Sequence, residues 1–79
     1  MPKLPIVSGS ELVKILTKLG YEVKRQKGSH IMLKKSFDIG EHNLTIPNHK
    51  EIAKGTLNDI LEKVSIWNNV SKSKLLEML

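Results

Sequence analysis

The stretch YEVKRQKGSHIMLKK, residues 21–35, decides the fold, because apolar residues alternate with polar ones on both sides of a Gly-Ser pair. Alternation with a period of two is typical of half-buried strands. We predict strands over residues 21–25 and 29–35, joined by a three-residue hairpin loop, residues 26–28. Gly28 then occupies the loop position that commonly needs a left-handed backbone. The stretch predicts one antiparallel hairpin.

A helix is predicted before this hairpin and a third strand after it. Ser8 and Glu11 have the spacing of a capping box, and Gly20 is a C-terminal stop signal. Between them, apolar residues recur at helical intervals: Leu12, Ile15, Leu16 and Leu19. The third strand, residues 43–47, ends at Pro47. The chain therefore begins with one helix followed by three strands.

A second amphipathic helix is predicted to begin at Thr56, which would be its N-cap, with Asp59 favourable in the first turn. Its apolar face is formed by Leu57, Ile60, Leu61 and Val64. A short third helix is predicted over residues 73–79. The order α-β-β-β-α indicates an α+β fold with a three-stranded antiparallel sheet and both main helices on one face.

The composition indicates one small domain spanning residues 1–79. Hydrophobic residues make up 39% of the chain, but Phe, Tyr and Trp occur once each, so the core is predicted to be aliphatic. The lack of cysteine excludes a disulfide framework and a thiolate metal site. No segment approaches the roughly 20 apolar residues of a membrane helix, so we expect a cytoplasmic protein without a membrane partner.

Positive charge is concentrated in the first half of the chain. Residues 1–37 carry a net charge of +6, whereas residues 38–79 carry −1. A localised basic surface attracts polyanions through counterion release, which favours nucleic acid as a partner. A lysine-rich surface that only maintains solubility is the alternative.

The strand alternation predicts which residues the sheet displays on the face that the helices leave open. We expect Val23 to lie opposite Ile31, with both facing the helices, and Lys24 to lie opposite His30. The open face would then carry Lys24, His30, Met32, Lys34 and Thr45. His30 is therefore expected to be exposed among lysines.

An exposed histidine among cations suits RNA cleavage. RNA carries its own nucleophile, the ribose 2′-hydroxyl, so a proton-transferring group and stabilising cations can suffice, and imidazole exchanges protons near neutral pH. Neither a metal site nor a Ser29–His30 dyad is indicated, because the acidic residues are scattered and adjacent strand residues point to opposite faces. No metal or other cofactor is expected. A plain surface histidine remains the alternative.

The chain resembles the HicA family of mRNA interferase toxins, and the resemblance extends over nearly the whole chain. It rests on three runs: GSELVKILTKLGYEVKRQKGSHIMLKK, LTIPNHKEIAKGTLNDILEKV and KLLEML. The resemblance implies a fold similar to the double-stranded RNA-binding domain, cleavage of mRNA, and neutralisation by a HicB-type antitoxin that covers the active site. The scattered acidic residues make this cleavage metal-independent in our prediction. The resemblance places the catalytic histidine at His30, with Gly28 and Ser29 supporting its turn. The RNA-binding residues would be Lys24, Arg25, Lys27, Lys34 and Lys35.

Other residues have less defined roles. His49 matches the family's Pro-x-His segment, so it is a candidate second proton-transfer or substrate-orienting group, with a structural role in the loop as the alternative. His42, in the turn-like run DIGEHN, is expected to face solvent. Trp67 is expected to anchor the C-terminal segment. A second hypothesis for the whole chain is a non-catalytic RNA-binding module that uses the same basic sheet face.

Overall fold

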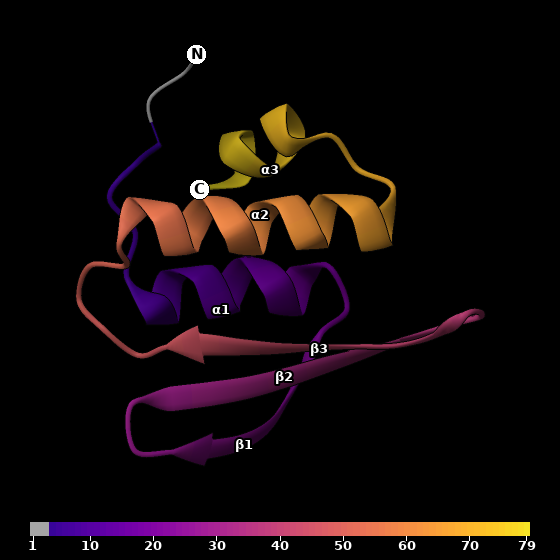
Figure 1. Ribbon diagram of the computed structural model, residues 1–79, viewed down its shortest axis with the longest axis horizontal. Helices are drawn as coiled ribbons and strands as arrows, with labels where there is room; N and C mark the ends of the chain where they lie inside the picture. The colour runs from indigo at the N-terminus through magenta and orange to yellow at the C-terminus, as the bar shows by residue number, and fades with distance from the viewer. Residues whose placement is uncertain (1–3) are drawn as a thin grey trace.

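The computed structural model describes residues 4–79 and shows a three-stranded antiparallel sheet with strand order β1-β2-β3 and three helices (Figure 1). This confirms the predicted α-β-β-β-α order and the short third helix. The elements are α1 (Gly9–Lys18), β1 (Glu22–Lys27), β2 (His30–Phe37), β3 (Gly40–Pro47), α2 (Lys54–Asn68) and α3 (Lys72–Met78).

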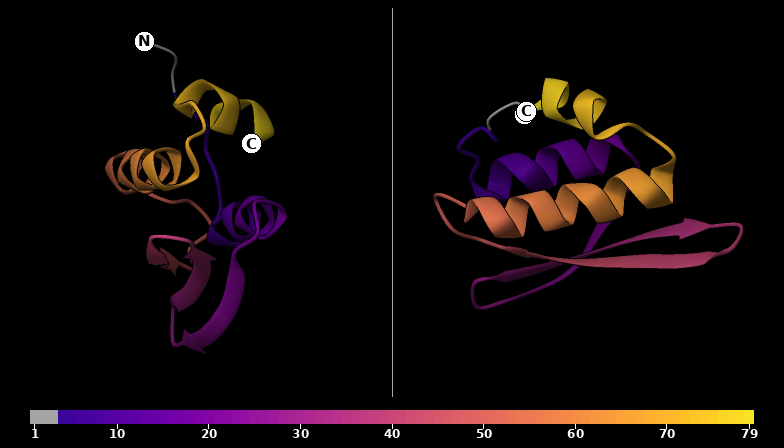
Figure 2. Two further views of the ribbon diagram at one scale, coloured as in Figure 1. Left: turned by 90° about the vertical axis from the view of Figure 1, so that its right-hand side faces the viewer. Right: turned by 45° about the horizontal axis from the view of Figure 1, so that its top comes forward.

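The elements form layers. Helices α1 and α2 lie side by side over one face of the sheet, and α3 packs on the far side of this pair (Figure 2). The core between them is aliphatic, as predicted, except for the buried Tyr21, and α3 contributes Leu75 to it, with 1% of that residue exposed. No helix among residues 4–79 is long and apolar enough to cross a membrane. The other face of the sheet has no helix over it, so its side chains are available to a partner.

Helix α1 begins as the sequence predicts. The Ser8 hydroxyl accepts a hydrogen bond from the Glu11 N–H at 3.1 Å, and the Glu11 carboxylate accepts one from the Ser8 N–H at 3.2 Å. This capping box satisfies two backbone N–H groups that would otherwise have no partner within the helix. Leu12 and Leu16 then enter the core.

Gly9, the first residue of α1, touches the segment that follows β3. A Cβ atom at this position would lie 2.2 Å from the Pro47 carbonyl oxygen. The Gly9 N–H also donates a hydrogen bond to the His49 carbonyl at 2.9 Å. Only glycine permits this backbone approach, so Gly9 fixes the start of α1 against the end of the sheet.

The pairing of β1 with β2 differs from the predicted register. Val23 pairs with Leu33 and Lys27 with His30, which leaves a two-residue loop, Gly28 and Ser29, instead of the predicted three. The register shifts at Lys24, where a β-bulge inserts one extra residue. Val23 shares the helix-covered face with its buried partner Leu33, as predicted, but on the edge strand it remains 48% exposed. The left-handed Gly28, with φ of +59°, is confirmed.

His42 is buried, so the expectation that it faces solvent is wrong. Strands β2 and β3 are longer than predicted, and their connecting turn is formed by Asp38 and Ile39. His42 therefore lies within β3 and is only 6% exposed. Its ring stacks on Trp67, with centroids 4.8 Å apart and an interplanar angle of 3°. Trp67 packs against the sheet in this way.

A hydrogen-bond network surrounds His42. The Asn68 amide donates to the Tyr21 hydroxyl oxygen at 3.1 Å, which leaves the hydroxyl proton for His42 Nδ1 at 2.6 Å. Nδ1 can accept this proton only when the imidazole is neutral. Burial lowers the pKa of His42, with the positive charge of Lys63 acting in the same direction, and burial raises the pKa of Tyr21. The network therefore holds His42 in its neutral form.

We expect the protein to lose stability as the pH falls from 7.5 to 5.5. The pKa of His42 is depressed in the folded state, so the unfolded chain binds more protons below the ordinary value of 6.5. The contribution of neutral His42 to the free energy of unfolding is fully present above pH 6.5, and it is lost as the pH falls toward the folded pKa. Thermal melting across this range measures the effect. His42→Gln should flatten the profile, and an unchanged slope in that variant would contradict this account.

The second main helix begins differently from the prediction. Its N-cap is Ala53, which makes no side-chain capping hydrogen bond, and Thr56 lies inside the first turn. Helix α3 has a better start, because the Ser71 hydroxyl accepts a hydrogen bond from the Lys74 N–H at 3.2 Å. The buried residues of α2 are Leu57, Ile60, Leu61 and Val64, as predicted.

Candidate functional site

His30 stands at the first position of β2, directly after the tight turn, and is exposed. The left-handed backbone of Gly28 closes the turn. The carbonyl of Ser29 accepts a hydrogen bond from the Asn48 N–H at 2.6 Å, which ties the hairpin to the loop after β3. His30 itself pairs with Pro47. The backbone on both sides of the imidazole is therefore held in place.

The strand pairing defines the residues that share the open face with His30. Met32 and Lys34 follow at alternate positions of β2, and their partners on β3 are Thr45 and Asn43. On β1, Lys27 pairs with His30 and Arg25 pairs with Met32. Lys24 also reaches this face, where it lies near Met32. The expectation that Lys24 lies opposite His30 is wrong, because Lys27 takes that position.

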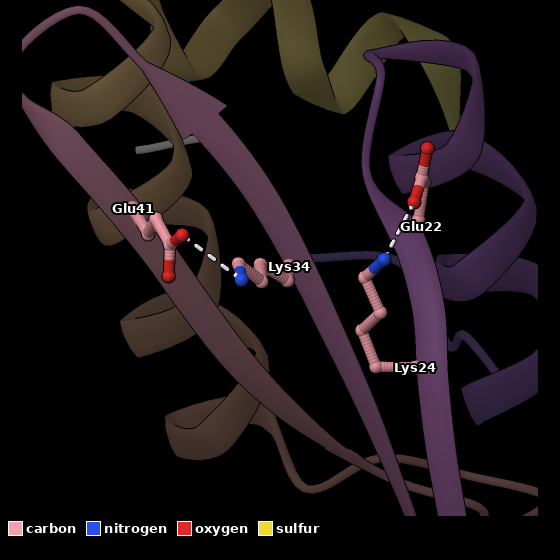
Figure 3. Close-up of polar contacts among 4 residues, drawn as sticks. All are labelled: Glu22, Lys24, Lys34 and Glu41. Carbon is pink, nitrogen blue, oxygen red and sulfur yellow. Dashed lines mark hydrogen bonds and ion pairs between the residues drawn. The ribbon is translucent and has the colours of Figure 1, made fainter.

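Two lysines of the open face are held in ion pairs, which Figure 3 shows. Lys24 Nζ lies 2.8 Å from the Glu22 carboxylate along β1, and Lys34 Nζ lies 2.9 Å from the Glu41 carboxylate on β3. The hydrogen bond and charge of Lys24 lower the pKa of Glu22, and those of Glu22 raise the pKa of Lys24. Both lysines thus have carboxylate partners in the free protein.

The cations nearest the hairpin turn lack such partners. The three ion pairs found within residues 4–79 use Lys24, Lys34 and Lys63. Arg25 and Lys27 take part in none of them, and both are exposed. The open face is therefore charge-compensated at one end and has uncompensated positive charge at the end that carries His30.

Lys35 lies on the opposite side of the sheet from the other predicted RNA-binding residues. Its Nζ donates to the Leu19 carbonyl and to the Asn68 amide oxygen, both at 2.6 Å. It also lies 4.8 Å from the centre of the Phe37 ring, as in a cation–π contact. These contacts hold the amine of Lys35 between the C-cap of α1 and the end of α2, so its placement among the RNA-binding residues is corrected to a structural position.

His49 lies in the loop after β3, two residues beyond the partner of His30. Its side chain is exposed, while its backbone carbonyl accepts the hydrogen bond from Gly9. His30 and His49 are therefore at the same end of the sheet, although β2 supplies one and a loop supplies the other.

A shallow hollow of about 600 Å³ opens on the same face, over Met32. Asn43 belongs to its lining but was absent from the predicted site, although strict alternation from Thr45 would have placed it there. Glu41 was missed because its segment was predicted to be a turn. Within residues 4–79, no group of three or more His, Cys, Asp or Glu side chains could hold a metal ion.

Comparison with known proteins identifies the family of this chain. Residues 9–66 match the family model described as the HicA toxin of bacterial toxin-antitoxin, which is well over half of the chain. This match places the protein in the class of toxins that belong to toxin–antitoxin pairs, and its kind of partner is therefore an antitoxin. The chain belongs to the HicA toxin family. Searches of curated proteins and of solved structures gave no match.

Proposed function

We propose that this protein is a metal-independent endoribonuclease that cleaves mRNA and arrests growth, with His30 as general acid or base. The observation that carries the proposal is the position of His30. It is exposed beside a fixed turn, at the end of the open face where Arg25 and Lys27 have no ion-pair partners, in a chain of the HicA family.

The proposed reaction uses the substrate's own nucleophile. The ribose 2′-oxygen loses its proton and attacks the adjacent phosphorus, and the 5′-oxygen leaves with a proton. His30 takes the first proton or supplies the second, and His49 is the candidate for the other transfer. The products are a 2′,3′-cyclic phosphate and a 5′-hydroxyl end. Nearby cations stabilise the charge that develops on the phosphoryl oxygens.

The phosphate contacts follow from the charge distribution. Arg25 and Lys27 can contact phosphates without breaking an existing ion pair, and Arg25 can do so with two parallel hydrogen bonds. Lys24 and Lys34 join them when a phosphate replaces Glu22 or Glu41. Lys35 is not part of this surface because its amine is used inside the fold.

The antitoxin partner is proposed to be of the HicB type and to cover the open face. A surface with exposed Arg25 and Lys27 attracts an acidic protein, and electrostatic complementarity speeds association. A partner bound there would cover His30 together with the phosphate contacts. Inhibition would then follow from blocking substrate access.

A non-catalytic RNA-binding module is the alternative, and the same basic face supports it. Such a module would use the open face for RNA binding without proton transfer. The two functions differ in the role of His30, because turnover depends on one imidazole far more than binding does.

We expect RNA with a 2′-deoxy sugar at the cleaved position to resist the enzyme, since the nucleophile is then absent. Cleavage of the all-ribose RNA should persist in excess chelator, because the proposed steps use only side chains and the 2′-hydroxyl. Gel analysis with end-group determination measures both. An absolute need for a divalent ion, or 5′-phosphate ends, would show that a different nucleophile acts.

A further inference from the structure

We propose that the hollow over Met32 is a subsite for one nucleobase of the RNA, and that Asn43 and Thr45 select the base. This inference rests on the proposed function, which it extends from the scissile phosphate to a neighbouring nucleotide. The hollow of about 600 Å³ combines an apolar floor, two polar side chains and a cationic rim, provided by Met32, Asn43, Thr45, Lys24, Arg25 and Lys34.

The floor of the hollow suits the flat face of a base. Met32 is 36% exposed, and it lies on the open face between cationic residues. A thioether is apolar and polarisable, and it makes favourable contacts with aromatic rings. Packing a base on Met32 would remove this apolar surface from water, while the sugar and phosphate stay near the rim.

The polar side chains are placed to contact the edge of such a base. Thr45 lies directly across from Met32, and Asn43 lies one position further along the same face of β3. Both are exposed. An amide offers a donor and an acceptor, and a hydroxyl offers either, which is the chemistry that distinguishes bases in single-stranded RNA.

The position of the hollow relative to His30 gives the base its place in the substrate. Met32 is two residues along β2 from His30 on the same face, which is about 7 Å in a strand. A base on Met32 therefore belongs to a nucleotide next to the scissile phosphate. Arg25, paired with Met32, can hold the phosphate of that nucleotide.

The cationic rim favours RNA over a protein side chain as the occupant. Lys24, Arg25 and Lys34 line the hollow. Arg25 has no ion-pair partner among residues 4–79, and the two lysines can exchange their carboxylate partners for a phosphate. An apolar side chain of a partner would gain nothing from these charges. A nucleotide suits both the apolar surface of Met32 and the cationic side chains, since its base is flat and weakly polar and its phosphate is anionic.

The test measures how RNA affinity changes when the Met32 side chain, one base of the RNA, or both are removed. The probes are 2′-fluoro RNA pentanucleotides, which lack the 2′-hydroxyl, in the four homopolymeric sequences and with an abasic site at each position in turn. Fluorescence anisotropy gives the affinities for the parent protein, Met32→Ala and Asn43→Ala. At one position, removal of the base should weaken binding by the parent about tenfold, and Met32→Ala should abolish that difference. Asn43→Ala should reduce the preference among the four sequences.

Ile66→Ala is the matched control, because Ile66 is a 79% exposed apolar residue on α2, away from the open face. It should bind all probes as the parent does. Equal abasic losses in the parent and in Met32→Ala would overturn the subsite, as would a Met32→Ala variant that weakens only the antitoxin complex. Binding is measured without turnover, so a failure of cleavage would leave this result intact. Asn43→Ala tests the subsite separately if Met32→Ala melts early.

Discussion

His30→Ala is expected to remove RNA cleavage and growth arrest while leaving the fold intact. Loss of one general acid or base typically lowers the rate by about 10² to 10⁴. His30 is exposed, so its truncation opens no core cavity and leaves no buried group unpaired. The free energy of unfolding should change by no more than about 0.5 kcal/mol, as at ordinary surface sites. Cleavage assays and thermal melting on one preparation measure both effects.

His49→Ala is the informative companion to this variant, since it removes the other exposed histidine at the same end of the sheet. If His49 transfers the second proton, its loss lowers the rate; if it serves the loop through its backbone carbonyl alone, the rate is preserved. RNA affinity should survive in both variants. A folded His30→Ala protein that cleaves at the parent rate would refute the proposed catalytic role and favour the binding-module alternative.

Gly9→Ala is expected to destabilise the protein strongly. The added methyl would lie 2.2 Å from the Pro47 carbonyl oxygen. Because both atoms belong to or are bonded to the backbone, the backbone must move to relieve this clash. That movement also strains the hydrogen bond from Gly9 to the His49 carbonyl. Overpacking together with a weakened hydrogen bond should lower the free energy of unfolding by about 2 to 4 kcal/mol. The melting temperature of so small a domain would then fall by at least about 10 °C.

Gly55→Ala is the control for this substitution. A Cβ at Gly55, near the start of α2, would meet no atom within 4 Å. Alanine is the better helix former, so this variant should be neutral or more stable by up to about 1 kcal/mol. If Gly9→Ala melts like the parent, the close contact between α1 and the end of β3 is not a constraint on the fold.

Local patterns were sufficient to predict most of the fold. The capping box at Ser8 and Glu11 and the apolar stripes of both main helices are confirmed. Alternation along residues 29–35 placed Ile31 and Leu33 in the core and so put His30 on the opposite face. These signals depend on residues close in sequence, and the tertiary structure preserves them.

The errors arise where pairing between distant residues decides the outcome. The bulge at Lys24 shifts the β1 register, and no local pattern marks it. His42 looked like a turn residue, yet Tyr21 and Trp67 provide the hydrogen bond and the stacking contact that bury it. The basic residues include Lys35 in the sequence prediction because the sequence shows its charge but not its partners, the C-cap carbonyl after α1 and the Asn68 amide of α2.

If this protein binds RNA as proposed, the ion pairs of Lys24 and Lys34 affect how long the RNA remains bound. A phosphate that reaches either lysine must displace Glu22 or Glu41, and the same carboxylate can return when the phosphate shifts. Each time a carboxylate returns to its lysine, the bound RNA loses one phosphate contact. Glu22 and Glu41 therefore compete with the phosphates of the product for Lys24 and Lys34. Under the proposed function, a toxin that cleaves many messages needs quick release after each cut, and Glu22 and Glu41 would shorten its residence time on cleaved RNA.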